Sequence, residues 1–217
     1  MFAHFLIRPV WIVAALLAAG ISLIRAQPYD DGGIAQLLVG GCTSLPCWQG
    51  IRPGHTTGPE ALAIMQQLGP VRELGSRLDS YFGQIFWRWS ADSSRFLNPQ
   101  TRERAYVWLE NGAVRTIYLP GFQTFADVSL LLGRPEQVII YTDATNYARY
   151  VAYLGVYPGQ TYLSILLTCD ADADDLWNAP ANVYIGDQPD YVNVRARTYE
   201  RSELRGWLPP RLCQRRR

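Results

Sequence analysis

The sequence contains no lysine, and all 20 of its basic residues are arginines, set against 19 acidic residues. Without Arg8 and Arg25 of the N-terminal segment, 18 basic residues remain, so the rest of the chain is close to neutral. Proteins that bind nucleic acid through its phosphates usually carry a clear basic excess. The charge balance therefore argues against a nucleic-acid partner.

Histidine is also scarce, since only His4 and His55 occur. A hydrolytic triad needs a histidine beside a nucleophile and an acid, and the sequence has no Gly-x-Ser-x-Gly motif. It has no glycine-rich phosphate loop and no His-Glu-x-x-His motif either. These absences argue against the common hydrolase, phosphoryl-transfer and zinc-protease chemistries. We expect no cofactor and no metal.

Long uncharged apolar runs are absent except near the N-terminus, where Val10 to Ile24 carries no charge. As a helix, a run of this length spans about 22 Å, less than the hydrocarbon core of a bilayer. Residues 1–26 are therefore expected to be either a cleaved signal peptide or a retained membrane anchor. Arg8 precedes the run and acidic residues follow it. Both alternatives place the remainder on the extracytoplasmic side of the cell membrane or in the medium.

The four cysteines, Cys42, Cys47, Cys169 and Cys213, allow three disulfide pairings. Zinc sites usually combine closely spaced cysteine pairs with further cysteine or histidine ligands, so a metal site is the weaker interpretation. Cys42 and Cys47 lie in one short loop, and an exported protein meets oxidising conditions. We predict a Cys42–Cys47 bridge, which leaves Cys169 to pair with Cys213.

Two segments begin and end alike, which indicates an internal repeat. Thr57-Gly58-Pro59-Glu60 has the spacing of a capping box, and the helix that follows should end at Leu68-Gly69. Thr124-Phe125-Ala126-Asp127 starts a second helix in the same way, with its stop at Leu132-Gly133. Apolar residues recur at helical spacing within both segments.

Alternating apolar residues predict four strands after each helix. The first set covers residues 71–75, 83–90, 104–110 and 113–119, and the second covers 136–142, 148–157, 161–168 and 181–186. We therefore predict an α+β fold with two tandem units behind an N-terminal hydrophobic helix. Each unit would be one helix with its own four-stranded antiparallel sheet.

The expected organisation of the chain follows from these segments. It comprises the signal peptide or anchor (1–26), a linker with the Cys42–Cys47 loop (27–56), the first unit (57–119), the second unit (120–187) and a C-terminal tail (188–217). Within the first unit, Asn111-Gly112 predicts a type I′ hairpin. That hairpin would put Trp108 opposite Arg115 as a cross-strand cation–π pair.

Aromatic residues are the best candidates for a binding site. Trp87 and Trp89 alternate on one predicted strand, and Tyr106 and Trp108 alternate on another. Rings on an exposed sheet face suit the binding of peptide or sugar, although ordinary packing within the core explains the same pattern.

Two acidic sets offer alternatives. Asp79, Asp92 or Glu103 would serve an envelope enzyme that acts on carbohydrate, provided that two carboxylates converge in an aromatic cleft. The run from Asp170 to Asp175 resembles a calcium loop, but it lacks the glycine and the glutamate of an EF-hand. A solvated loop is the simpler interpretation of that run.

The caps, stops and strands also resemble known families. Thr124-x-x-Asp127-Val128, followed by Leu132-Gly133-x-Pro135, resembles the motif of the small outer-membrane assembly lipoproteins of BamE type. The doubling resembles β-lactamase inhibitory protein, which is built from tandem copies of a related α/β unit. The segment Pro46-Cys47-Trp48-x-Gly50-Ile51-x-Pro53-Gly54-x-Thr56-Thr57 resembles the openings of exported proteins from filamentous soil and sediment bacteria. Together these resemblances cover roughly residues 42–187.

The resemblances imply a non-enzymatic module that binds protein or envelope material. We therefore expect an exported or membrane-anchored binding or scaffold module. Its partner would be a protein or a component of the cell envelope, with the membrane as a second partner if residues 1–26 are retained.

Overall fold

The computed structural model divides the chain into two compact units, Met1–Asp31 and Gly32–Arg217. It describes residues 13–22, 33–42, 46–69, 71–79, 81–90, 97, 103–143, 150–189 and 194–204.

Within Met1–Asp31, residues 13–22 are helical. The large apolar side chains of this helix, Val13, Leu16, Leu17 and Ile21, are exposed. In the described part of the chain, no helix has the length and apolar character needed to span a membrane. The expected N-terminal hydrophobic helix is therefore not found as a membrane-spanning helix among the described residues. The remainder of the apolar run lies outside the described residues, so the choice between signal peptide and anchor stays a prediction.

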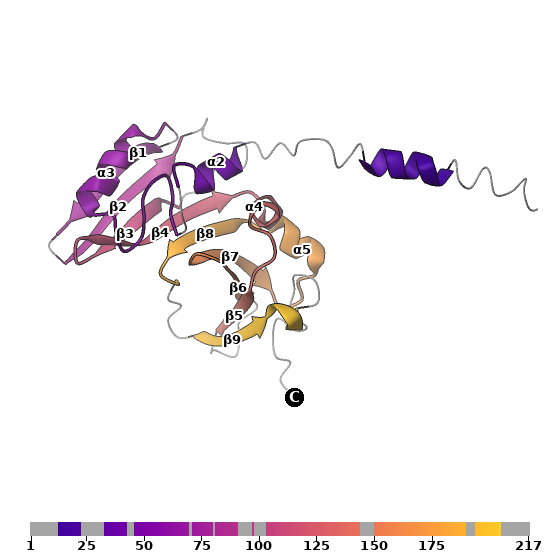
Figure 1. Ribbon diagram of the computed structural model, residues 1–217. Helices are drawn as coiled ribbons and strands as arrows, with labels where there is room; N and C mark the ends of the chain where they lie inside the picture. Colours follow the sequence, from indigo (N-terminus) through magenta and orange to yellow (C-terminus); the bar gives the residue numbers. More distant parts are fainter. Residues whose placement is uncertain are drawn as a thin grey trace, which may run out of the picture. The chain divides into compact units, whose positions relative to one another are not determined.

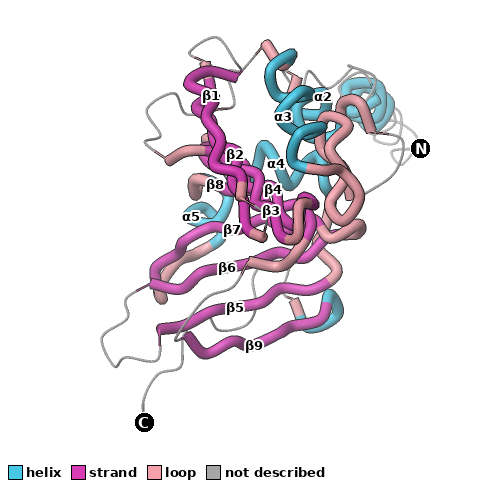
Figure 2. Tube along the Cα trace, turned by 90° about the vertical axis from the view of Figure 1, so that its left-hand side faces the viewer, coloured by secondary structure: helices cyan, strands magenta, loops and turns pink. Residues whose placement is uncertain are grey.

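The compact unit Gly32–Arg217 is built around one antiparallel sheet of nine strands in the order β1-β2-β3-β4-β8-β7-β6-β5-β9. The strands are β1 (Val71–Leu78), β2 (Phe82–Trp89), β3 (Ala105–Glu110), β4 (Ala113–Phe122), β5 (Gln137–Asp143), β6 (Tyr150–Tyr157), β7 (Thr161–Thr168), β8 (Ala181–Gly186) and β9 (Val194–Glu200). In Figure 1 the strands from β8 to β9 follow one another along an arc. In Figure 2, β5, β6 and β9 run across the view while β1 runs up it, so the sheet is strongly twisted.

The prediction of two separate four-stranded sheets is wrong, because both runs of strands belong to one sheet. The last strand of the first run, β4, pairs with the last strand of the second run, β8, and Ile117 lies opposite Ile185. An edge strand exposes unpaired N–H and C=O groups, and pairing two edges satisfies both. The junction also joins the apolar residues of the two runs into one main core.

Four α-helices and one 3₁₀ helix accompany the sheet in the described part of Gly32–Arg217. They are α2 (Ile34–Val39), α3 (Gly58–Gln67), α4 (Phe125–Leu132), α5 (Ala173–Asn178) and η1 (Arg201–Glu203). Both helix starts expected from the sequence are present. The Thr57 amide and hydroxyl each donate to Glu60 Oε2 at 2.9 Å, and Thr124 Oγ1 accepts from the Asp127 amide at 3.1 Å. The hydrogen bond from the Thr57 amide is the main cause that lowers the pKa of Glu60.

The segment expected as a linker, residues 27–56, contributes to the core. Trp48 is fully buried and stacks on Trp87, with ring centroids 5.4 Å apart and planes 14° apart. The indole N–H of Trp48 donates to the Leu37 carbonyl at 2.7 Å, and this bond holds Trp48 against α2 within the same segment. Aromatic stacking and burial of both rings stabilise this arrangement.

The predicted Cys42–Cys47 disulfide is confirmed. It closes a loop that comes just before the buried Trp48. Cys169 is also disulfide-bonded. Cys213 lies outside the described residues, so the Cys169–Cys213 pairing stays a prediction.

The segment expected as a tail, residues 188–217, supplies the ninth strand. β9 pairs with β5 from Glu200 opposite Gln137 to Val194 opposite Asp143. Beyond the strand, the Arg201 guanidinium donates to the Pro135 carbonyl at 3.0 Å and to the Arg134 carbonyl at 2.6 Å. These bonds fix the end of β9 against the segment that follows α4.

Candidate ligand-binding groove

The side chains of β3 define the two faces of the sheet. Ala105, Val107 and Leu109 are buried, and Leu109 lies close to Gly58 at the start of α3. The alternate residues of β3, among them Tyr106 and Trp108, lie on the opposite face. We call this opposite face the open face.

The turn after β3 shapes the open face. Asn111 and Gly112 have φ angles of 52° and 78°, which is the conformation required by the predicted type I′ hairpin. The predicted pairing of Trp108 with Arg115 is wrong, because the register shifts and Trp108 lies opposite Thr116 instead. Arg115 is the extra residue of a β-bulge, which redirects its side chain.

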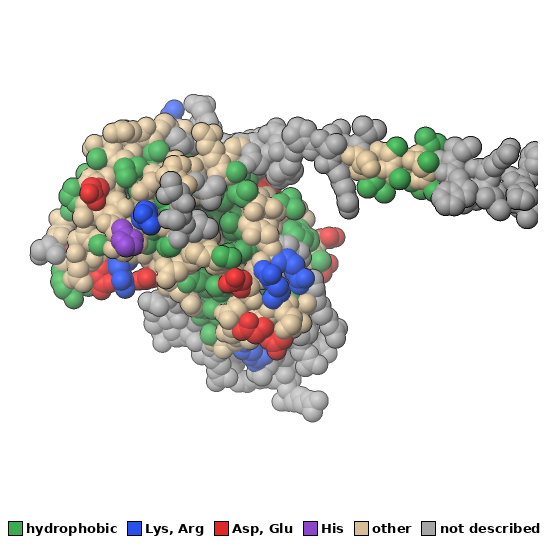
Figure 3. Space-filling view, in the orientation of Figure 1, with side chains coloured by type: hydrophobic (Ala, Val, Ile, Leu, Met, Phe, Trp, Pro, Cys, Tyr) green, Lys and Arg blue, Asp and Glu red, His purple; other side chains and the backbone are tan. Residues whose placement is uncertain are grey.

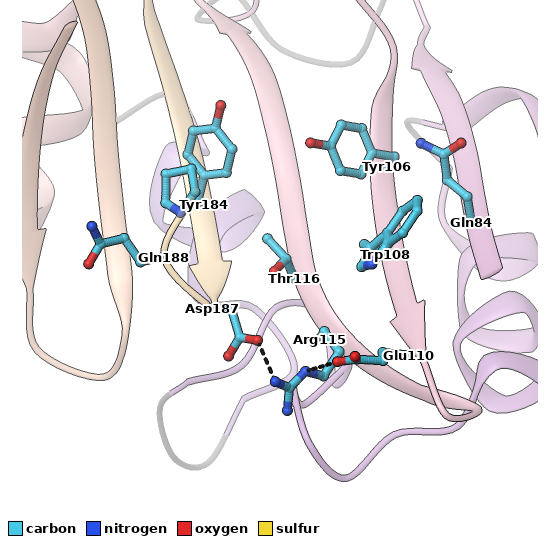
Figure 4. Close-up of a pocket in the computed structure, with 10 residues that line it drawn as sticks. Gln84, Tyr106, Trp108, Glu110, Arg115, Thr116, Tyr184, Asp187 and Gln188 are labelled. Atoms are coloured by element: carbon cyan, nitrogen blue, oxygen red, sulfur yellow. Dashed lines mark ion pairs between the residues drawn. The ribbon is translucent and has the colours of Figure 1, made fainter. Parts of the chain in front are cut away.

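Arg115 joins two carboxylates at one end of the open face. Its Nε lies 3.0 Å from Glu110 Oε2, and its Nη2 lies 2.9 Å from Asp187 Oδ2. Figure 4 shows the guanidinium between the two carboxylates. Because Glu110 ends β3 and Asp187 follows β8, this network connects the first run of strands to the second.

A row of aromatic rings crosses the open face. Phe86, Tyr106, Tyr118, Tyr184 and Tyr162 occupy successive register positions on β2, β3, β4, β8 and β7. The Tyr106 and Tyr118 ring centroids are 4.8 Å apart, and the Tyr118 and Tyr184 centroids are also 4.8 Å apart. Such cross-strand aromatic pairs stabilise a sheet and form a rigid platform.

Tyr118, in the middle of this row, is the most buried of the three stacked tyrosines. Its hydroxyl donates a short hydrogen bond to Glu103 Oε2. Burial, followed by this hydrogen bond, raises the pKa of Tyr118 well above its usual value. The phenol therefore stays protonated and acts as a donor that fixes the ring.

Beside the tyrosine row lies a groove of about 620 Å³. From the strands it takes Gln84, Tyr106, Trp108, Glu110, Arg115, Thr116 and Tyr184. The other described lining residues, Asp187, Gln188 and Pro189, follow β8. In Figure 4 the ion-paired network lies at the lower end of the groove, with Trp108 and Gln84 on one side and Gln188 on the other. Gln188 is held in turn by a hydrogen bond of 2.5 Å to the Tyr141 hydroxyl.

Several polar groups of the groove have no hydrogen-bond partner in the part of the chain that the structure describes. Among the described residues, none bonds to the Gln84 amide or the Trp108 indole N–H. Glu110 and Asp187 each engage one carboxylate oxygen with Arg115. Groups of this kind are available to a ligand that can both donate and accept hydrogen bonds.

Exposed aromatic residues continue from the groove to the turn between β1 and β2. Trp108 is 40% exposed and its ring lies 6.1 Å from that of Phe82. Phe82 is 46% exposed and contacts Tyr81, which is 55% exposed, edge-on at 4.7 Å. Large rings left in water next to a groove are typical of a recognition surface.

The structure separates the four aromatic residues singled out in the sequence. Tyr106 and Trp108 line the groove. Trp87 is fully buried in the core, and its Nε1 has no hydrogen-bond partner among the described residues. Trp89 is half-buried and donates to the Pro120 carbonyl at 3.1 Å. Trp87 and Trp89 contribute to packing and lie outside the groove.

Sequence reasoning missed several lining residues, above all Gln84, Thr116, Tyr184 and Asp187. Tyr184 carried a usable signal, because it alternates with the buried Val183 and Ile185 on a predicted strand. The others are ordinary polar residues whose meeting depends on the pairing of β4 with β8. No local pattern in the sequence marks that pairing.

The acidic residues considered for catalysis do not meet in the described structure. Asp79 holds the turn before β2, where its Oδ1 accepts from the Tyr81 and Phe82 amides at 2.8 and 2.5 Å. Phe82 lies opposite Glu110, so this turn adjoins the last residue of β3, whereas Glu103 precedes the first residue of the same strand. Six residues of β3 separate the two carboxylates by roughly 20 Å. Asp92 lies outside the described residues.

The acidic run at residues 170–175 starts a helix. Asp172 Oδ1 accepts from the Asp174 and Asp175 amides at 2.8 and 3.0 Å, at the beginning of α5. Asp175 reciprocates by accepting from the Asp172 amide at 3.1 Å. In the parts of the chain that the structure describes, no three His, Cys, Asp or Glu side chains are placed to hold a metal ion.

Charges of both signs lie interspersed on the face seen in Figure 3, without a large patch of one sign. No protein-family model, curated protein or solved structure matches this chain. The resemblance to the assembly lipoproteins and to the inhibitory protein therefore stays a hypothesis.

Proposed function

We propose that this chain is a non-catalytic binding protein that holds its ligand in the groove of the open face. The observation that carries the proposal is the exposed indole of Trp108, which borders a groove whose Gln84 amide has no partner among the described residues. Tryptophan, tyrosine and arginine dominate the energetics of many recognition sites. The groove volume of about 620 Å³ falls within the usual range for ligand pockets.

The arrangement of the groove carboxylates supports binding over acid–base catalysis. Both Glu110 and Asp187 hold Arg115. In a glycosidase the two carboxyl groups flank the scissile bond, whereas here both groups are turned toward one guanidinium. The paired carboxylates therefore act as fixed hydrogen-bond acceptors.

The proposal includes a location outside the cytoplasm, at the membrane or secreted. The Cys42–Cys47 disulfide supports this location, because disulfides persist mainly in oxidising compartments. A phosphatase reporter that is active only outside the cytoplasm, fused after Gln27 and separately after Arg217, should be active. Inactive reporters at both positions would overturn the proposed compartment.

Sedimentation with the envelope fraction of the producing cells tests the binding function. The wild-type chain should sediment with this fraction, and Trp108→Ala should lose most of that binding. Leu130→Ala is the matched control, because Leu130 is 62% exposed on α4 and does not line the groove. Equal sedimentation of wild type and Trp108→Ala would contradict the proposal, as would a wild-type chain that stays in the supernatant.

A further inference from the structure

We infer that the groove binds a neutral oligosaccharide, one sugar ring of which stacks on Trp108. This inference rests on the proposed binding function and names its class of ligand. It starts from an exposed indole beside polar groups that have no partner among the described residues. Gln84 lies opposite Trp108 in the register of β2 and β3, so the amide and the ring are neighbours on one face.

The two carboxylates of the groove are positioned before a ligand arrives. Arg115 holds Glu110 through Oε2 and Asp187 through Oδ2. The second oxygen of each carboxylate remains to accept a hydrogen bond. Because the guanidinium spans both groups, less side-chain freedom is lost when a ligand binds, and this lowers the entropic cost of association.

A sugar ring matches both kinds of group. Its C–H face is apolar and suits the indole of Trp108, while its hydroxyls both donate and accept hydrogen bonds. The Gln84 amide offers a donor and an acceptor, and the carboxylate of Glu110 offers an acceptor. The sugar thereby satisfies groups that would otherwise stay unpaired within the complex.

Charge favours a neutral ligand. The described residues of the groove include two carboxylates, Glu110 and Asp187, and one guanidinium that already pairs with both. An anionic ligand such as a phosphate would meet repulsion from two carboxylates and no free cation among these described lining residues. A ligand without charge meets neither difficulty.

The groove has room for more than one sugar ring. Gln84, Trp108 and Thr116 occupy successive register positions on β2, β3 and β4, and Tyr184 belongs to the adjacent β8. Four neighbouring strands span about 14 Å from the first to the last. A chain of sugars laid across the strands from β2 to β8 would contact the Gln84 amide, the Trp108 indole and the Tyr184 ring in that order.

A protein partner fits these groups less well. A broad protein surface laid over the exposed rings of Tyr81 and Phe82 would cover the groove without filling it. Each polar group then left buried and unpaired in the groove would weaken the complex about tenfold or more. A sugar chain is thin enough to enter and to reach the Gln84 amide.

The test is sedimentation of the full exported chain with the envelope fraction. Before the chain is added, one sample of the envelope fraction is treated with periodate, which cleaves the vicinal diols of sugars, and another is treated with protease. Binding should be lost after periodate and retained after protease. Calorimetry with soluble dextran, laminarin, mannan and xylan then identifies a neutral sugar that binds.

Variants test the assigned contacts with that sugar. Trp108→Ala should weaken binding of the sugar about tenfold or more. The affinity of Trp108→Tyr should stay within about threefold of wild type, because an aromatic ring can stack on the sugar in both proteins. Gln84→Leu should weaken binding about tenfold, since it removes the amide and keeps the bulk. Leu130→Ala should bind as wild type, and unchanged unfolding midpoints would show that all variants fold.

Retention of binding after periodate, with no soluble neutral polysaccharide bound in calorimetry, would overturn the saccharide inference. If protease then removes the binding and Trp108→Ala still lacks it, the ligand is a protein and the proposed binding function stands. If Trp108→Ala sediments like wild type under every treatment, the proposed function fails together with the inference.

Discussion

Arg115 and Asp187 are joined twice, once through the main chain and once through their side chains. The Asp187 amide donates to the Arg115 carbonyl at 3.1 Å, and Arg115 Nη2 lies 2.9 Å from Asp187 Oδ2. The residue before Asp187 is Gly186, whose φ of 106° lies in the region that favours glycine. The end of the groove therefore depends on a glycine that lines no part of it.

Gly186→Ala should lower the free energy of unfolding by at least about 2 kcal/mol, because the backbone is strained for an L-residue. The added Cβ would also clash with the Arg115 carbonyl oxygen. Urea unfolding measures the loss. Gly69→Ala is the control, since a Cβ there meets nothing within 4 Å. Equal midpoints for Gly186→Ala and wild type would contradict the described backbone at this position.

Trp87 and Trp108 should respond oppositely to truncation. Trp87→Ala empties a site that is fully buried against Trp48, and we expect a loss of about 3–5 kcal/mol. Trp108→Ala removes a side chain that is 40% exposed, and its cost should stay below about 1 kcal/mol. Thermal unfolding of both variants checks the order, and a larger loss for Trp108→Ala would show that the faces are assigned wrongly.

The lowered pKa of Glu60 predicts a pH effect on stability. A carboxyl whose pKa is depressed in the folded state contributes stability above its unfolded pKa, near the usual 4.5, and loses it as the pH falls through the folded pKa. Wild type should therefore exceed Glu60→Gln in stability at neutral pH, and this difference should shrink below pH 4.5.

Urea midpoints measured from pH 7 down to about pH 3 test this prediction. Glu136→Gln is the control, because Glu136 is exposed and engages Val156 only through its backbone amide. A stability difference between wild type and Glu60→Gln that does not change with pH would refute the role of the capping carboxylate.

Removal of the first disulfide should have a moderate effect. Cys42 and Cys47 are five residues apart, and closing so short a loop restricts the unfolded chain by about 2 kcal/mol. The double variant Cys42→Ala/Cys47→Ala should lose roughly that amount in urea unfolding under oxidising conditions. A loss of more than twice this size would mean that the bridge also holds the packing of Trp48.

The second pairing is open to direct mapping. Peptide mapping without reductant should recover Cys169 linked to Cys213. This bridge would close a much longer loop, so its removal should cost up to about 4 kcal/mol. A free thiol at Cys169 in protein prepared without reductant would rule out the pairing.

Local features of the fold could be read from the sequence because neighbouring residues determine them. The Thr57 cap depends on Glu60 three residues later, and the Asn111-Gly112 turn depends on two positive φ angles that these residues tolerate. Strand alternation also located segments such as Thr161–Thr168, which forms β7. Of the apolar residues that recur at helical spacing in the segment after Thr57, Met65 is fully buried, whereas Leu68 is only partly buried.

Features that depend on distant partners could not be read in this way. β9, with the sequence VRARTYE, has little apolar alternation, and its place is set by β5. The strand alternation groups Trp87 with Trp89 and Tyr106 with Trp108, yet it does not say which face the helices cover. The register settles this point, because Trp87 lies opposite the buried Ala105 and so shares its face. The groove was unpredictable for the same reason.

Because β4 pairs with β8, the groove forms where the two runs of strands meet. Trp108, Glu110 and Arg115 come from the first run of strands, whereas Tyr184 and Asp187 come from the second. Neither run of strands forms the groove alone, and Arg115 would keep only one of its two carboxylates if the first run were isolated. A ligand bound across β4 and β8 would contact both runs at once, so its binding would stabilise the pairing of the two runs.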